Sequence, residues 1–304
     1  FCPAAAKRDR SSNLGALGRT MLSVQWTSFK AQYSRSYATV AEDAARFAIF
    51  SSNMAEAKAL TNAALAAGLD TKVRRAHDVC FDQQQLTSLP PRCLPHCAHS
   101  LPFQFGATKF SDLTPAEFAA THLNYLAGSV VPTSTLDVVV TGNVTARDWR
   151  GNLTTPVKDQ GDCGSCWAFS ATEQMESMWL KAEPSKAVPL SAQQITSCDK
   201  ADLGCNGGDT KSAYASVMKE GGMMTEKAYP YTSGKKGKSG KCEFEKAKVV
   251  MTIKSHANVG KKNEGTMTTY VGNIAPLSIC VDASKWQNYK KGIMTCVIGG
   301  RVVM

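Results

Sequence analysis

The stretch that decides the fold is Val157–Ser170, VKDQGDCGSCWAFS. It places Cys163 and Cys166 close together directly before a tryptophan, with Gln160 a short distance upstream. Apolar residues recur at helical spacing over 166–181, so we expect Cys166 at the start of a helix with Ser165 as its N-cap. The positive end of a helix dipole favours a thiolate and lowers the pKa of a cysteine placed there. The stretch therefore predicts a nucleophilic cysteine.

A cysteine nucleophile that attacks a carbonyl group needs donors for the oxyanion that forms. The backbone N–H of Cys166 and the side-chain amide of Gln160 are the expected donors. The alternatives are a redox pair made by Cys163 and Cys166, or one half of a zinc site. A redox pair usually follows a strand in a βαβ unit, and none is predicted here. A zinc site needs a second close pair, so the nucleophile is the favoured interpretation.

Composition limits the class of protein. The chain has 304 residues, enough for one to three domains, and a formal charge of +10. Its basic residues are scattered and no recognition motif accompanies them, so we expect no nucleic-acid partner. Eleven cysteines favour an oxidising compartment, and the sequons at Asn143 and Asn152 are compatible with secretion. No signal peptide and no apolar run of about 18 residues is visible, so no membrane span is expected.

The pattern along the chain predicts a helical first part and a mixed second part. Apolar spacing over 24–69 predicts a helical stretch, and Thr114, Pro115 and Glu117 predict a helix that starts at Pro115 with a capping box. Residues 127–145 read as an extended linker. Two short β-branched runs, Val249–Ile253 and Leu277–Val281, are predicted strands.

The stretch of about 73–104 interrupts the helical part without apolar periodicity. It contains Cys93-x-x-His96-Cys97-x-His99, which could form a zinc cluster, although the spacing fits no common structural zinc pattern. An inserted disordered loop and a retained intron are the other two interpretations. A transcript that runs from about Lys72 directly to Phe105 would support the intron.

Several further segments together resemble the papain family of cysteine proteases, and within it cathepsin L-like zymogens. The segments that carry the resemblance beyond the opening stretch are Asp148–Arg150, Leu190–Gln194, Cys205–Gly208, Tyr229–Tyr231, Val281–Ala283 and Tyr289–Ile293, with Glu42-x3-Arg46-Phe47-x2-Phe50-x2-Asn53 and Gly106-x-Thr108-x-Phe110-x-Asp112 upstream. The match covers about 22–70 and 105–296.

The resemblance implies an α+β, papain-like fold of two domains, a helical left domain and an incomplete β-rich right domain, preceded by an α-helical inhibitory propeptide. The implied parts are an unassigned tail at 1–21, a propeptide at 22–126 that includes the insert, a linker at 127–142 and a peptidase domain at 143–304. The propeptide would run through the cleft against the direction of a substrate and keep the zymogen silent until acidification.

The resemblance also assigns roles to residues. Cys166 would be the nucleophile and Gln160 the oxyanion donor. The loop of Asn206, Gly207 and Gly208 would hydrogen-bond the substrate backbone as an added strand, because glycine permits close backbone approach. The implied disulfides are Cys163–Cys205 and Cys198–Cys242. The implied partners are a peptide or protein substrate and the chain's own propeptide, in a monomer without cofactor or metal, in a lysosome or vacuole or outside the cell.

The chain departs from the family at the catalytic base. No histidine follows Gly292–Cys296, the last histidine is His256, and no asparagine lies beyond Asn288. His256 precedes the expected strand at 277–281 and is not expected to replace the base. Without a base both proton transfers lose their shuttle, each typically worth 10²–10⁴-fold in rate. We therefore predict an inactive, C-terminally truncated and poorly soluble chain whose open strand edges lack partners.

Two explanations of this departure stay open. The insert begins at Val73, and the last eight residues, which do not resemble the family, begin at Val297. Valine codons begin with the bases of a splice donor. The last residues could therefore be intron read-through, or the chain could be a real truncated form. A competing function is a non-catalytic inhibitor that uses the helices of 22–126 to block a related protease. A transcript that continues into a segment with histidine and asparagine would favour the enzyme.

Overall fold

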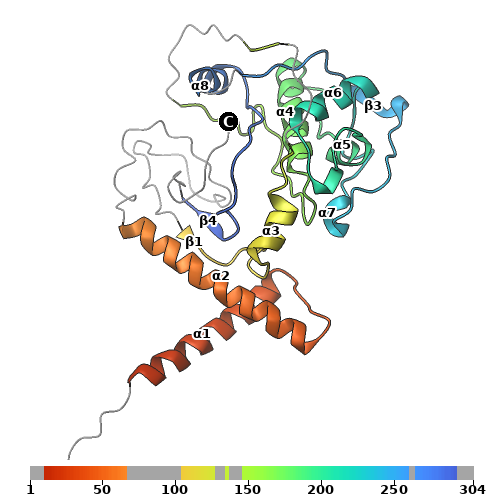
Figure 1. Ribbon diagram of the computed structural model, residues 1–304. Helices are drawn as coiled ribbons and strands as arrows, with labels where there is room; N and C mark the ends of the chain where they lie inside the picture. The colour runs from red at the N-terminus through yellow and green to blue at the C-terminus, as the bar shows by residue number, and fades with distance from the viewer. Residues whose placement is uncertain (1–9, 67–103, 127–133, 137–145, 260–263, 293–304) are drawn as a thin grey trace, which may run out of the picture. The chain divides into compact units, whose positions relative to one another are not determined.

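The structure is a computed structural model that describes residues 10–66, 104–126, 134–136, 146–259 and 264–292 (Figure 1). The chain forms two compact units. The first, called here the hairpin unit, comprises 1–72, 84–115 and 285–294. The second, called the main unit, comprises 73–83, 116–284 and 295–304. Each unit is described by itself.

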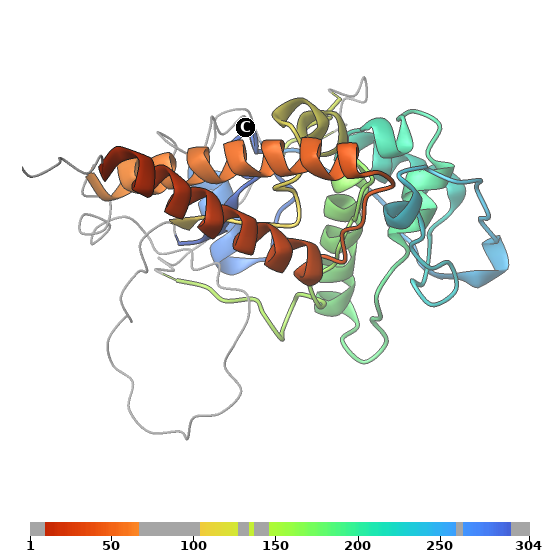
Figure 2. The ribbon, with the colours of Figure 1, turned by 90° about the horizontal axis from the view of Figure 1, so that it is seen from below.

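Two long helices, α1 (Arg10–Gln32) and α2 (Val40–Ala66), form a helical hairpin (Figure 2). The prediction of one helical stretch over 24–69 missed the break between them. At the break Ser34 takes a positive φ of 52°, and Thr39 begins a capping box. The Thr39 hydroxyl accepts the Glu42 N–H at 3.1 Å, and the Glu42 carboxylate accepts the Ala38 N–H at 2.9 Å.

Aromatic residues hold the hairpin together. Trp26, Phe29 and Phe50 are buried, and the ring centroid of Trp26 lies 5.3 Å from that of Phe29 and 5.2 Å from that of Phe50. These residues recur at helical spacing on α1 and α2, so the two apolar faces meet. In the same unit β1 (Gln104–Phe105) pairs antiparallel with β4 (Tyr289–Lys291), which joins segments far apart in the sequence.

Helix α4 (Cys166–Ala182) forms the centre of the main unit and packs against α5 (Ala192–Cys198) and α6 (Thr210–Glu220). Trp167, Ala168, Ala171, Met175 and Trp179 lie on its buried face at three- and four-residue spacing. The helix ends at Ala182, and its C-cap Glu183 directly precedes Pro184, as expected because proline disfavours a helical residue before it. The core thus fixes the end of the helix where Cys166 lies.

The remaining elements of the main unit are short. They are α3 (Pro115–His122), η1 (Gly204–Asn206), β2 (Met223–Met224), α7 (Ser233–Lys236), η2 (Lys246–Lys248), β3 (Val249–Met251) and α8 (Glu264–Asn273). The predicted start of α3 at Pro115 is confirmed. The strand predicted at 249–253 is present as β3, which pairs antiparallel with β2.

The strand predicted at 277–281 is wrong. These residues form no strand, because no other described segment pairs with them in a ladder. Ile279 and Val281 are exposed there. The β-branched run therefore carries the side chains of a strand without its hydrogen-bond partners, which shows that β propensity depends on a neighbouring strand.

A buried ion pair anchors α4 from the side. Glu176 is 1% exposed, and its Oε2 lies 2.5 Å from Lys158 Nζ and accepts the Thr155 hydroxyl. Its Oε1 accepts the buried backbone N–H of Leu190 at 2.7 Å. Both carboxylate oxygens are therefore satisfied, as a buried charge requires.

Two disulfides join loops of the main unit. Cys163 is bonded to Cys205, and Cys198 to Cys242, the two pairs that the resemblance implies. Among the described helices none is both long and apolar enough to cross a membrane. The segment Cys93–His99, with its possible zinc cluster, and nearly all of the insert lie outside the described residues, as does most of the predicted linker.

Candidate active site

Cys166 is the first residue of α4, as the sequence predicts. Ser165 is the N-cap residue, as predicted, although its side chain makes no capping hydrogen bond. Its hydroxyl instead pairs with the Tyr231 hydroxyl at 2.7 Å, and the Tyr231 hydroxyl also donates to the Gln160 carbonyl oxygen at 3.0 Å. Ser165 therefore ties the start of the helix to the loop before it.

The Cys166 thiol is free and partly buried. Burial raises its pKa, and the backbone N–H groups of Trp167 and Cys166 act in the opposite direction. The expectation of a lowered pKa is therefore wrong for this thiol, because desolvation outweighs the helix end. A thiolate at this position needs a further positive charge to become the dominant form at neutral pH.

The Gln160 side chain lies beside the same helix end. Its Nε2 donates to the Cys163 carbonyl oxygen at 2.8 Å. This bond fixes the amide within the loop that carries both cysteines. Its other N–H remains suited to an oxyanion, since an amide nitrogen has two donors.

The glycine loop is held next to this helix end by the Cys163–Cys205 disulfide and by the Gly164 N–H, which donates to the Cys205 carbonyl oxygen at 2.9 Å. Gly207 has a φ of 115°, which a residue with a side chain rarely adopts. A Cβ atom on Gly208 would lie 2.5 Å from the Trp167 ring. Glycine is therefore required at both positions.

A segment from before the linker lies on this loop. Tyr125 forms a parallel bridge with Gly208, and the Leu126 N–H donates to the Gly208 carbonyl oxygen at 3.3 Å. The Asn124 side chain donates to the Cys205 carbonyl oxygen at 3.1 Å. A Cβ on Gly207 would lie 1.9 Å from the Asn124 carbonyl oxygen, so the segment uses the space that the glycines leave.

Three residues at this loop were not predicted as site residues. The Tyr125 hydroxyl donates to Asp209 Oδ2 at 3.3 Å and hydrogen-bonds with the Cys280 thiol, and both neighbours help burial raise the pKa of Tyr125 to about 12. Cys280 is a second free thiol, and the charge of Cys166 contributes to raising its pKa, after burial and Asp209. In the sequence Cys280 is one residue of the predicted strand at 277–281, and nothing in that pattern indicates that it lies near Cys166.

His256 lies elsewhere in the main unit. Its ring is 5.7 Å from that of Tyr214, and burial lowers its pKa. The groups that shift the Cys166 pKa are burial and two backbone N–H groups. His77, His96 and His99 lie outside the described residues. His122, the other described histidine, stacks on Phe118 at 5.1 Å, and neither it nor His256 is among the groups that shift the pKa of Cys166.

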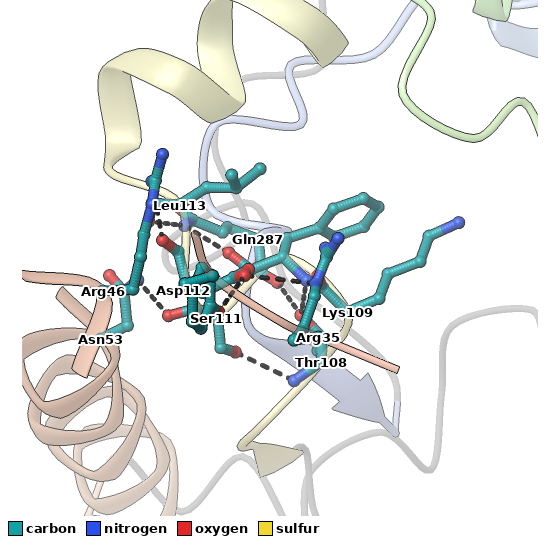
Figure 3. A network of polar contacts seen from close by, with 11 residues as sticks. Arg35, Arg46, Asn53, Thr108, Lys109, Ser111, Asp112, Leu113 and Gln287 are labelled. Carbon is teal, nitrogen blue, oxygen red and sulfur yellow. Dashed lines mark hydrogen bonds and ion pairs between the residues drawn. The ribbon is translucent and has the colours of Figure 1, made fainter. Parts of the chain in front are cut away.

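The hairpin unit contains a polar network around Asp112 (Figure 3). Arg35 Nε lies 3.2 Å from Asp112 Oδ2, which also accepts the Tyr37 hydroxyl at 2.8 Å. Asn53 donates to the Ser111 and Leu113 carbonyl oxygens, and Arg46 to that of Asp112. The two upstream sequence motifs thus bind each other, since Arg46 and Asn53 belong to one and Asp112 to the other.

The same network includes the segment that carries β4. Gln287 donates to the carbonyl oxygens of Phe110 and Leu113, and the Thr108 hydroxyl donates to the Gln287 carbonyl oxygen at 2.5 Å (Figure 3). The Ser111 hydroxyl donates to Asn288 at 2.7 Å. The second upstream motif therefore binds the residues directly before β4 within the hairpin unit.

A thiol at a helix end, a disulfide-anchored glycine loop and an upstream segment on that loop define the class of cysteine-protease proforms. A model described as "Papain family cysteine protease" matches residues 143–301, and one described as "Cathepsin propeptide inhibitor domain (I29)" matches 26–67. The chain belongs to the papain family of cysteine proteases.

Individual proteins support the same assignment. Cysteine proteinase 15A of Pisum sativum is 34% identical over 281 residues, which cover 88% of this chain and 66% of that protein. Cysteine proteinase 2 of Leishmania pifanoi is 34% identical, with 89% and 55% covered. The chain thus spans between about half and two-thirds of the length of these relatives.

Solved structures of precursors share the fold. A digestive procathepsin L 3 of Tenebrio molitor larval midgut has a TM-score of 0.70 and 25% identity, with 90% of this chain and 78% of that chain covered. A recombinant stem bromelain precursor has a TM-score of 0.65 and 26% identity, with 90% and 76% covered. The predicted α+β, papain-like fold with a propeptide is therefore confirmed.

Proposed function

We propose that the chain is a cysteine endopeptidase zymogen in which Cys166 is the nucleophile and residues 22–126 are the inhibitory propeptide. The observation that carries the proposal is the parallel bridge between Tyr125 and Gly208. This isolated bridge supports the proposal because a segment of the chain itself then occupies the loop that would bind substrate. The proposed peptidase domain is 143–304, with 127–142 as linker.

The proposed reaction is hydrolysis of a peptide bond through an acyl-enzyme. The Cys166 thiolate would attack the carbonyl carbon, with the oxyanion held by the Cys166 N–H and the Gln160 amide. The Asn206–Gly208 loop would hold the substrate backbone in an added strand. Water would then release the acyl group from Cys166.

Acylation needs a group that takes the thiol proton and gives one to the leaving amine, and deacylation needs a group that takes a proton from the attacking water. The described residues supply no imidazole to Cys166, and burial raises its pKa. We propose that the chain of 304 residues does not turn over peptides. We also propose localisation in a lysosome or vacuole or outside the cell, which the family and the two disulfides support.

The test is labelling of Cys166 by a peptidyl electrophile, read by mass spectrometry on the full chain. The double variant Asn124→Ala, Tyr125→Ala should be labelled faster than the unaltered chain, because the glycine loop becomes free to bind the probe. Iodoacetamide, which does not bind the loop, is the control reagent, and its rate of labelling at Cys166 should increase less in the double variant. An equal increase in the labelling rate with both reagents would contradict the proposal.

A second candidate is a non-catalytic inhibitor of a related protease. It is favoured by the Asp112 network, which preorganises the hairpin unit independently of Cys166. The full chain with Cys166→Ala should then inhibit a papain-family enzyme, and Asp112→Ala should weaken inhibition. Inhibition that is unaffected by Asp112→Ala would refute this second function.

A further inference from the structure

Asp209 follows the glycine loop directly and is the N-cap residue of α6. Its side chain is 1% exposed, and its Oδ1 accepts the Lys211 N–H at 2.9 Å. This capping bond uses one carboxylate oxygen, and a serine or an asparagine would make it equally well. The cap alone therefore does not explain why this position carries a buried carboxylate.

The second carboxylate oxygen, Asp209 Oδ2, interacts with two donors of different origin. One is Lys211 Nζ at 3.1 Å, which belongs to the same helix. The other is the Tyr125 hydroxyl at 3.3 Å, which belongs to the segment that lies on the glycine loop. An ionised carboxylate oxygen accepts about two hydrogen bonds, so Oδ2 can hold the ammonium and the hydroxyl at once.

The Tyr125 hydroxyl reaches Asp209 because the backbone of its segment is paired with the glycine loop. Tyr125 forms the parallel bridge with Gly208, and the Leu126 N–H donates to the Gly208 carbonyl oxygen at 3.3 Å. Residues paired across a ladder project their side chains from the same face, whichever way the two strands run. A substrate residue paired with Gly208 would therefore project its side chain to the place that Tyr125 occupies.

We propose that Asp209 is a specificity-determining residue that selects peptides with a tyrosine paired with Gly208, whose hydroxyl replaces that of Tyr125. The inference rests on the proposed function, since it names the substrate side chain that the glycine loop takes. Tyr125 then carries the preferred side chain within the chain's own propeptide.

The charges at the site favour a neutral donor over a cation. Lys211 already neutralises Asp209, so a substrate lysine or arginine would bring a second positive charge to one carboxylate. A substrate phenylalanine would leave Asp209 Oδ2 without the hydroxyl donor, and a site that hydrogen-bonds a hydroxyl rejects the analogue that lacks it. A tyrosine avoids both costs.

The phenol at this place is a donor over the whole working range of pH. Burial first, and then the charge of Asp209, raises the pKa of Tyr125 to about 12. A tyrosine hydroxyl bound here therefore keeps its proton in acid and at neutral pH, and ionisation of the phenol does not alter the selection.

The size of the preference is limited by solvent and by distance. Tyr125 is 47% exposed, and 3.3 Å is long for a hydrogen bond from a hydroxyl. A hydrogen bond to a charged group is worth about 10- to 100-fold in affinity when it is well buried. At this half-exposed place we expect about fivefold between tyrosine and phenylalanine.

The experiment measures labelling of Cys166 by tripeptidyl chloromethyl ketones in the full chain with Asn124→Ala and Tyr125→Ala, read by mass spectrometry. The reference probe contains three alanines, and tyrosine or phenylalanine replaces each alanine in turn. At one position the tyrosine probe should react about fivefold faster than the phenylalanine probe. Adding Asp209→Ser should abolish this difference, because serine keeps an N-cap oxygen but lacks the second oxygen that binds the hydroxyl.

Lys211→Gln is the matched control, because it keeps the Asp209 carboxylate and removes the competing charge. It should retain the tyrosine preference and raise the rate of a lysine probe at the same position. Equal rates for tyrosine and phenylalanine at all three positions would overturn this inference. The proposed function would still stand if the peptidyl probes gained more than iodoacetamide from the double variant, and equal gains would contradict both.

A second measurement decides if the double variant does not fold. Tyr125→Phe alone removes one hydroxyl and should raise the labelling rate of the trialanine probe about fivefold, because the segment loses its bond to Asp209. The same change should have no effect in a chain that carries Asp209→Ser. A labelling rate that Tyr125→Phe leaves unchanged in the otherwise unaltered chain would also overturn the inference.

Discussion

Replacement of Glu176 by alanine should destabilise the main unit more than any surface change. The substitution removes the partner of Lys158, whose side chain is only 15% exposed, and leaves a nearly buried ammonium without a counter-charge. Breaking a buried ion pair in this way costs about 3–5 kcal/mol. It also leaves the buried Leu190 N–H without its acceptor, which alone costs about 1–3 kcal/mol.

These costs overlap because they concern one site, so we expect a total loss of about 4–5 kcal/mol in the free energy of unfolding. For a unit of this size that corresponds to a fall of about 10–15 °C in Tm. Helix α4 begins at Cys166, so the thiol should become more accessible to alkylation in the variant because the helix loses the contacts that Glu176 makes.

The assay is urea and thermal unfolding of the full chain, followed by circular dichroism. Glu183→Gln is the matched control, because the Glu183–Lys186 pair is exposed and should contribute less than about 0.5 kcal/mol. The double variant Glu176→Met, Lys158→Met should recover part of the loss, since it removes both charges. A loss below about 1 kcal/mol in Glu176→Ala would refute the reasoning.

Three further predictions concern other parts of the chain. Removal of the Cys198–Cys242 disulfide by serine at both positions should cost up to about 4 kcal/mol in urea unfolding, since the cysteines are 44 residues apart; an unchanged midpoint would contradict this. Trp26→Ala should cost about 3–5 kcal/mol and reduce helical circular dichroism from the hairpin unit, and a native spectrum and melt would contradict it. Gly208→Ala should cost about 1–3 kcal/mol by overpacking against Trp167 and should slow peptidyl labelling, whereas wild-type stability and labelling together would count against the packing described here.

The sequence predicted the fold where side-chain pattern and local geometry agree. Helix α4 was predictable because its apolar residues recur on one face and Cys166 follows a glycine and serine. The start of α3 was predictable from Pro115, which has no N–H to lose at the first helical turn. The capping box at Thr39 was equally visible and would have divided the first helical stretch correctly.

The parts that could not be predicted depend on contacts between distant residues. The run at 277–281 has the residues of a strand, but a strand exists only when a neighbour completes the ladder. Ser165 is the predicted N-cap residue, but its hydroxyl makes no capping bond because it pairs with the hydroxyl of Tyr231, 66 residues away. The net pKa of Cys166 depends on burial, which the helix position alone does not show.

The motif residues of the site were predictable, but the residues that surround them were not. Cys166, Gln160 and the glycine loop follow from local motifs, which the family resemblance interprets. Tyr125, Asp209 and Cys280 meet only in the folded chain.

The central proposal is that Cys166 is the nucleophile of a papain-type site in which no described histidine serves as its imidazolium partner. The most direct test is the alkylation rate of Cys166 by iodoacetamide in the full chain from pH 5 to 10, read by mass spectrometry. Because burial raises the thiol pKa above its ordinary 9.0, the rate should rise about tenfold per pH unit up to at least pH 9. A fast plateau between pH 5 and 8 would reveal a thiolate stabilised by a positive charge and would contradict the claim.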